Sequence, residues 1–140
     1  MPIELAGYAS LFGVADLAGD VVFRGAFTRA LAGRGALPML LDHDPRLPCG
    51  LWRDLREDAR GLFVTGAVLP DRRAGGLARR RLAGGLDGLS IGFTPLAWRK
   101  RADGGRDLLE IHLWEVSLVG APMLPQARLS ATVPVASLTE

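Results

Sequence analysis

The hydrophobic residues of this chain fall into short runs separated by glycine, proline and aspartate, a pattern typical of strands and turns. Six runs have the length and composition of strands: Ile3 to Phe12, Leu37 to Leu41, Leu47 to Asp58, Gly61 to Leu69, Leu89 to Phe93 and Asp107 to Val119. The residues Asp58 to Gly61 join two of these runs and predict an antiparallel hairpin.

Two other segments predict short helices. The first is Ala26 to Leu31, which follows Gly25 and is ended by the glycines at 33 and 35. The second begins at Asp71, a residue suited to an N-cap, and runs to about Ala83 before two glycines. Because strands dominate and their connections look antiparallel, we predict a mainly β fold with added helices (α+β), either a small β-barrel or a strongly bent sheet.

The length of the chain suits one domain. It has 140 residues, of which 49% are hydrophobic, enough for a core of its own. We predict a domain over residues 1–128 and an extended or loose C-terminal tail over residues 129–140. No run of 18 apolar residues occurs, and the first four residues, MPIE, lack the pattern of a signal peptide. We therefore expect a soluble protein that binds no membrane and stays in the cytoplasm.

The charge balance and the residue content argue against nucleic-acid binding, disulfides, metal sites and nucleotide cofactors. The 17 basic and 15 acidic residues give a net charge of +2, a balance that does not suggest nucleic-acid binding. Five arginines between positions 72 and 81 are typical of a solvated helix face, with a site for an acidic partner as the alternative. The single cysteine, Cys49, excludes an internal disulfide and a cysteine-rich zinc site. Two histidines and no paired cysteines predict no metal, and the absence of a glycine-rich nucleotide loop predicts no nucleotide cofactor.

Ser90 has the most distinctive setting of the serines. Glycines stand two positions before and two positions after it in the segment GLSIGF, which lets the backbone approach a substrate closely. This spacing is like that of the nucleophile elbow of hydrolases, but Pro95 follows within five residues and no helix can be predicted there. The alternative is a tight strand crossing or a bulge.

The two histidines are the only candidates for the base that a serine hydrolase requires. His43 follows a predicted apolar strand and lies between two aspartates, which also suits a surface histidine. His112 lies within the long predicted strand, on the face that also carries Glu110 and Trp114, and there it is more often an exposed or half-packed residue.

Glu115 is the third candidate. It shares one face of the same strand with Leu113 and Ser117, so its carboxylate would point inward, which is costly unless it is paired. A buried carboxylate beside an imidazole could orient the ring and stabilise its charged form. The alternative is an edge-strand glutamate that faces water, and composition also leaves open a glycosidase-type carboxylate pair.

Taken in order along the chain, six segments resemble the prohead protease family of tailed phages. They are GYASLF at 7–12, GDVV at 19–22, GAF at 25–27, LDHD at 41–44, GLSIGF at 88–93 and EVSLV at 115–119. The resemblance extends from about residue 3 to about residue 128. It implies a bent β-barrel of the herpesvirus capsid-assembly protease (assemblin) type.

The resemblance also implies the roles of the site residues. It makes Ser90 the nucleophile, His43 its base and Glu115 the third member of a triad. Because the herpesvirus enzymes have a histidine in the third position, His112 is the alternative. The stretch Gly120-Ala121 corresponds to the backbone groups that stabilise the oxyanion.

The function implied is that of a serine endopeptidase. It would cleave the scaffold or the major capsid protein precursor inside the immature procapsid, in the cytoplasm of a bacterial host, for a tailed phage, a prophage or a gene transfer agent. The resemblance implies no cofactor and leaves a homo-oligomer open. The alternatives are a non-catalytic capsid-assembly or scaffold-binding module of the same fold and a small esterase that uses the same serine and histidine.

Overall fold

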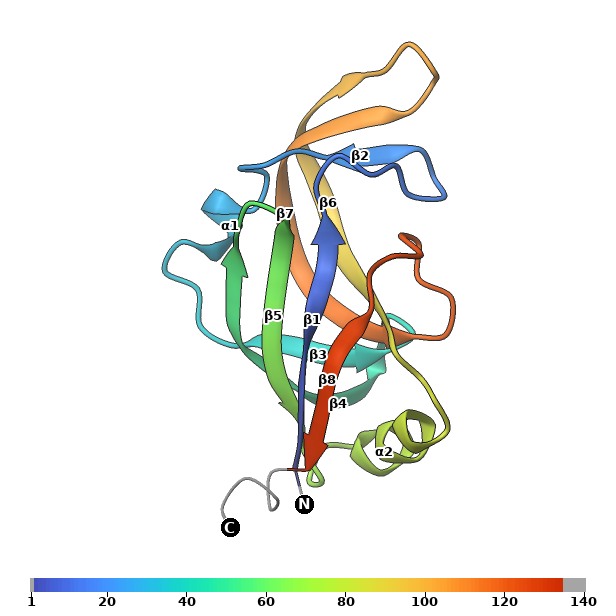
Figure 1. Ribbon diagram of the computed structural model, residues 1–140. Helices are drawn as coiled ribbons and strands as arrows, with labels where there is room; N and C mark the ends of the chain where they lie inside the picture. Colours follow the sequence, from blue (N-terminus) through green and yellow to red (C-terminus); the bar gives the residue numbers. More distant parts are fainter. Residues whose placement is uncertain (1, 135–140) are drawn as a thin grey trace.

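The computed structural model describes residues 2–134. Eight strands form most of the molecule: β1 (Ile3–Leu11), β2 (Asp20–Val22), β3 (Leu37–Leu41), β4 (Asp44–Glu57), β5 (Gly61–Val68), β6 (Gly88–Lys100), β7 (Arg106–Val119) and β8 (Leu129–Pro134). Two short helices, α1 (Thr28–Leu31) and α2 (Gly75–Ala83), lie outside the sheet (Figure 1). The predicted fold class, mainly β with added helices, is confirmed.

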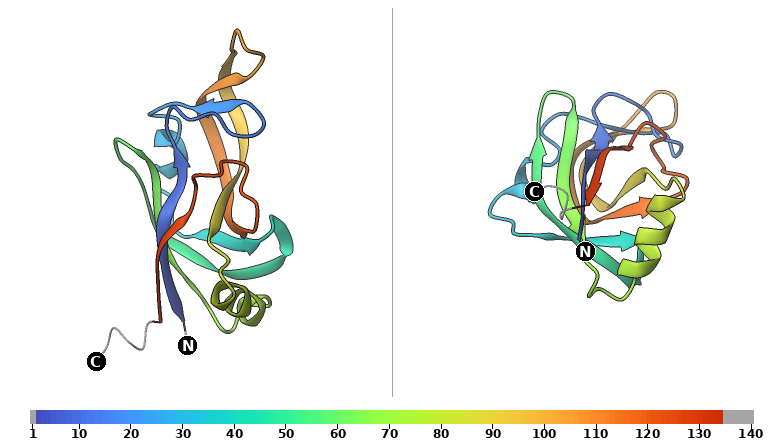
Figure 2. Two further views of the ribbon diagram at one scale, coloured as in Figure 1. Left: turned by 45° about the vertical axis from the view of Figure 1, so that its right-hand side comes forward. Right: turned by 60° about the horizontal axis from the view of Figure 1, so that its bottom comes forward.

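All eight strands belong to one sheet with the order β2-β7-β3-β4-β5-β1-β8, and β6 pairs with β7 outside this path. The sheet curls on itself like a half-barrel, which is clearest in the end-on view of Figure 2. The long β6–β7 hairpin projects beyond the rest of the sheet (Figure 1). Near its base, the β7 segment 116–118 pairs in parallel with β3, which brings the ends of β3, β6 and β7 together.

The inner face of the curled sheet holds the core. Trp52 of β4 is fully buried, and its indole Nε1 donates a hydrogen bond of 3.0 Å to the carbonyl of Val116 in β7. Phe27, which precedes α1, is also fully buried. The indole N–H is the only polar group of this large ring, and its hydrogen bond to β7 satisfies it and links β4 to β7 across the core.

The hairpin between β4 and β5 forms as predicted. Asp58 stabilises its turn, because its Oδ1 accepts hydrogen bonds from the backbone N–H groups of Arg60 and Gly61. Two other expectations are wrong in part. β6 continues to Lys100 instead of ending at Phe93, since a strand that pairs on one side only can accommodate Pro95. The connections are not all antiparallel, because β2 and β3 both pair in parallel with β7.

The second helix begins later than the sequence suggested, and Asp71 does not cap it. α2 starts at Gly75, with Ala74 in the N-cap position and no side-chain cap. Backbone hydrogen bonds from Arg72 to Leu69 and from Gly75 to Arg72 hold the intervening residues in turns. A Cβ on Gly75 would lie 2.3 Å from the carbonyl oxygen of Leu69, so the start of the helix packs directly on the end of β5.

The segment expected to be a tail begins with a strand. Residues Leu129–Pro134 form β8, which pairs antiparallel with β1 and closes one side of the sheet. The remainder of the expected tail, residues 135–140, lies outside the described residues. Among residues 2–134, no helix is long and apolar enough to cross a membrane.

Candidate active site

The β6–β7 pair places Ser90 and Glu115 on one face of the sheet. Ser90 lies opposite Ser117, and Gly92 lies opposite Glu115. Directly opposed residues of an antiparallel pair project to the same face, as do residues two apart in one strand. A Cβ at position 92 would lie 2.7 Å from Cδ of Glu115, so the Glu115 side chain occupies the space that Gly92 leaves open.

His43 reaches this face from the turn between β3 and β4. Asp42 and His43 have backbone φ angles of 53° and 58°, in the left-handed region that non-glycine residues seldom adopt. Such a conformation costs about 1–3 kcal/mol per residue, so the surroundings must hold it. The backbone N–H of Asp42 donates to the carbonyl of Leu118, and an ion pair of 2.9 Å joins the Asp42 carboxylate to Arg81 of α2.

Glu115 binds the imidazole of His43. The distance from Nδ1 of His43 to Oε1 of Glu115 is 2.8 Å, and the distance to Oε2 is 3.3 Å. The Glu115 side chain is only 10% exposed, whereas that of His43 is 42% exposed. The hydrogen bond to Glu115 raises the pKa of His43 above the ordinary value of 6.5, against the smaller opposing effect of burial. With Nδ1–H directed at the carboxylate, Nε2 is the nitrogen free to accept a proton.

Ser117 connects the base and the carboxylate. Its hydroxyl accepts a hydrogen bond of 3.0 Å from the backbone N–H of His43 and donates to the Glu115 carboxylate at 3.0 to 3.1 Å. Ser117 is fully buried. One hydroxyl therefore holds both the turn that carries His43 and the group that orients its ring.

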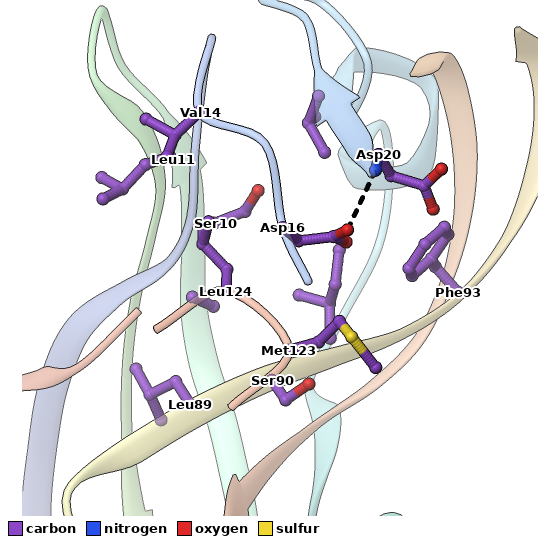
Figure 3. A pocket seen from close by; sticks show the side chains of 13 residues that line it. Ser10, Leu11, Val14, Asp16, Asp20, Leu89, Ser90, Phe93, Met123 and Leu124 are labelled. Atoms are coloured by element: carbon purple, nitrogen blue, oxygen red, sulfur yellow. Dashed lines mark hydrogen bonds between the residues drawn. The ribbon is translucent and has the colours of Figure 1, made fainter. Parts of the chain in front are cut away.

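Two hollows lie beside the residues His43, Glu115, Ser117 and Ser90. The first, here called the His43 hollow, is open at the surface and is lined by His43, Ile91, Gly92, Phe93, Trp114 and Glu115. The second, here called the Ser90 pocket, is more enclosed and adjoins Ser90 between β1, β6 and the loop that follows β7 (Figure 3). Ile91 and Phe93 line both, so the two hollows are neighbours. Ser90 itself is 8% exposed.

The Ser90 hydroxyl makes no hydrogen bond with any of residues 2–134. Catalytic hydrogen bonds are often long or poorly aligned before substrate binds. The only cysteine is a poor nucleophile, since Cys49 is fully buried and burial raises the pKa of its thiol to about 12. The hydroxyl of Ser90 is thus a free polar group in the wall of the Ser90 pocket, on the sheet face that also carries Glu115.

The other candidate residues, His112, Gly120 and Ala121, form no hydrogen bond with His43 or Glu115 and line neither hollow. His112 lies opposite Thr94, and its ring packs edge-on against Trp114 at 4.1 Å between ring centroids. Gly120 and Ala121 are exposed at the end of β7 and line neither hollow. The residues of this loop that reach the Ser90 pocket are Met123 and Leu124.

Sequence reasoning gave no role to Ser117 or to Arg81. The Glu-Val-Ser spacing, with two polar residues on one face of an otherwise apolar strand, was the available signal for Ser117. Arg81 belongs to the arginine cluster that suggested a solvated helix face, and nothing local indicated Asp42 as its partner, 39 residues away.

Comparison with known proteins identifies the family of this chain. The profile of the caudovirus prohead serine proteases matches residues 2–138. The chain belongs to this family. The prohead protease of Enterobacteria phage HK97 is 38% identical over 91 residues, which cover 63% of this chain and 40% of the phage protein. The chain therefore spans well under two thirds of the length of that relative.

Solved structures of two viral proteases share the fold of this family member. The capsid assembly protease of bacteriophage T4 superposes with a TM-score of 0.66 and 16% identity, over 83% of this chain and 80% of the other. The protease of Kaposi's sarcoma herpesvirus, in complex with a hexapeptide phosphonate inhibitor, gives a TM-score of 0.65 and 16% identity, over 92% and 64% of the two chains. The expected assemblin-type fold is thus confirmed.

Proposed function

We propose that this chain is a serine endopeptidase that cleaves the major capsid protein precursor, or a scaffold segment, during procapsid maturation. The observation that carries the proposal is the hydrogen bond between His43 and Glu115 on the face of the sheet that also carries Ser90. Membership of the prohead serine protease family supports the same reaction. A non-catalytic assembly module would have no need of a buried carboxylate that orients an imidazole.

The mechanism follows from the tautomer that Glu115 imposes. Nε2 of His43 takes the proton of the Ser90 hydroxyl as Oγ attacks the scissile carbonyl, and the Glu115 carboxylate stabilises the imidazolium that forms. His43 then gives the proton to the leaving amine, and water hydrolyses the acyl-enzyme by the same route in reverse. We propose that backbone N–H groups of the loop after β7 hold the oxyanion, at Met123 or Leu124, which line the Ser90 pocket, and not at Gly120 and Ala121, which line neither hollow.

The substrates and the place of action follow from the proposed reaction. The HK97 relative is a prohead protease, and the T4 relative is a capsid assembly protease. We propose by analogy that this chain acts inside the immature procapsid in the host cytoplasm, without a cofactor, on capsid or scaffold chains of its own particle.

Co-expression with the major capsid protein of the same genome tests the proposal. We expect the capsid protein to lose an N-terminal or C-terminal segment, seen as one discrete product by intact-mass analysis. A capsid protein that keeps its full mass in the presence of the folded chain, in assembled procapsids, would contradict the proposed function.

The pH dependence of the rate follows from the raised pKa of His43. The base acts only when it is neutral, and the hydrogen bond to Glu115 keeps it protonated to a higher pH than a free imidazole. We therefore expect kcat/KM to fall as the pH drops through a midpoint above 6.5, the ordinary value of histidine. A rate profile measured from about pH 5 to pH 9 checks this. A midpoint at or below 6.5 would argue against His43 as the base.

A further inference from the structure

The Ser90 pocket is lined by two acidic side chains that the mechanism does not use, Asp16 and Asp20. Asp16 lies in the loop between β1 and β2 and lines the pocket together with Ser90. In the view of Figure 3, Met123 lies between Ser90 and Asp16. Most of the remaining lining is apolar and includes Val22, Leu89, Ile91, Phe93 and Leu124.

The loop holds the Asp16 carboxylate in place by one of its two oxygens. Oδ1 accepts hydrogen bonds from the backbone N–H groups of Ala18 at 2.8 Å and Asp20 at 2.9 Å. The N–H of the next residue, Leu17, donates to the carbonyl of Met123, so this loop is joined to the loop after β7. Oδ2 has no hydrogen-bond partner among residues 2–134, although every fully buried side-chain oxygen there has one. Oδ2 is therefore not fully buried.

The second aspartate of the pocket differs, because its charge is already compensated. Both carboxylate oxygens of Asp20 bind the Arg106 guanidinium, at 2.8 and 2.9 Å. Burial is the largest influence on Asp16 and raises the pKa of its carboxyl above the ordinary value. A cation placed in the pocket would offset this burial and stabilise the charged carboxylate.

The direction of the proposed reaction decides which part of a substrate enters this pocket. His43 must protonate the leaving amine, so the segment after the scissile bond lies over the His43 hollow. The residue before the scissile bond stays attached to Ser90 and lies on the other side of it. His43 does not line the Ser90 pocket, which is therefore on the side of the acyl group.

We propose that the Ser90 pocket receives the side chain of the residue immediately before the scissile bond, and that Asp16 makes the protein select lysine or arginine there. This rests on the proposed function. The apolar walls contact the methylene groups of such a side chain, and the carboxylate meets the charge at its end. The walls alone would favour an uncharged aliphatic residue, so the preference for a cation comes from Asp16.

Two phosphonate probes that differ by one amino group test the proposal. They are the N-acylated diphenyl phosphonates of lysine and of norleucine, which has the same four-carbon side chain without the amine. In the reaction, a bond forms between Ser90 Oγ and phosphorus, the bond to one phenoxide breaks, and the serine proton leaves with it as phenol. Intact-mass analysis over time gives the labelling rate, and Ser90→Ala identifies the site.

We expect the wild-type chain to react about thirtyfold faster with the lysine probe than with the norleucine probe, the order of selectivity that a charge-assisted contact provides. Asp16→Asn should remove most of this difference and leave the norleucine rate unchanged within about threefold. The amide oxygen of asparagine can still accept from Ala18 and Asp20, so the loop keeps its hydrogen bonds. Asp71→Asn is the matched control, because it removes the same charge from an aspartate with a side chain that is 76% exposed and outside the pocket.

The outcomes separate this inference from the proposed function. If wild type reacts equally with both probes at Ser90, the inference is wrong and the serine nucleophile stands. If Asp16→Asn slows both probes alike, Asp16 has a structural role only, and the inference is again wrong. If neither probe labels Ser90 in the folded chain, the proposed function fails, and the inference fails with it.

Discussion

Ser90→Ala is expected to reduce cleavage of the capsid precursor by about a thousandfold or more, because it removes the nucleophile and leaves only binding and oxyanion stabilisation. The fold should be unaffected. The hydroxyl makes no hydrogen bond within residues 2–134, so the free energy of unfolding should change by less than about 0.5 kcal/mol. Cleavage is measured by intact mass of the co-expressed capsid protein, and stability by thermal unfolding.

Ser130→Ala is the matched control for this variant. Ser130 is exposed in β8 and donates only a hydrogen bond of 3.3 Å to the carbonyl of Ala6. It should cleave at the wild-type rate. Wild-type cleavage by a folded Ser90→Ala protein would show that the nucleophile has been assigned wrongly.

Glu115→Gln is expected to lower kcat by roughly a hundredfold, because a neutral amide cannot stabilise the imidazolium of His43. The substitution should also move the acidic limb of the rate profile to lower pH, since the hydrogen bond to Glu115 is what raises the pKa of His43. A merely structural role would not shift this limb. Rates measured against pH for wild type and variant separate the two roles.

His112→Ala provides the comparison on the same strand. His112 packs against Trp114 and has no hydrogen bond or ion pair with His43 among the described residues, so its loss should change kcat by less than about tenfold. Both variants are measured on one precursor. The reverse ranking would transfer the third role from Glu115 to His112.

The sequence pattern was sufficient to predict single strands and the hairpin, because these depend on residues close together in the chain. Leu37 to Leu41 is β3 with the boundaries that the apolar run indicated, and Asp58 and Gly61 made the β4–β5 hairpin predictable. The order in which distant strands pair in the sheet could not be predicted from the sequence. β3 and β7 pair in parallel although more than 70 residues separate them, and nothing within either strand indicates its neighbour.

In the candidate site too, the sequence indicated single residues but not the contacts between distant ones. The residue types and the glycines around Ser90 could be found in the sequence, and the family resemblance selected His43 and Glu115. The contact between His43 and Glu115, 72 positions apart, depends on the sheet order. Asp16 gave no signal at all, because its importance lies in one unpartnered oxygen and in the loop that brings it to the Ser90 pocket.

The parallel β3–β7 pair also determines when the histidine can become competent during folding. The backbone of the Asp42-His43 turn is held by Leu118 and by Ser117, both in the last residues of β7. Contacts between residues so distant in sequence carry a large loop-closure cost and tend to form late in folding. A nascent chain that has not yet made this pair has neither the orienting carboxylate nor the left-handed turn. Under the proposed function, His43 can therefore act as a base only after β7 has been synthesised and has paired with β3, and we expect no cleavage of partner proteins before that point.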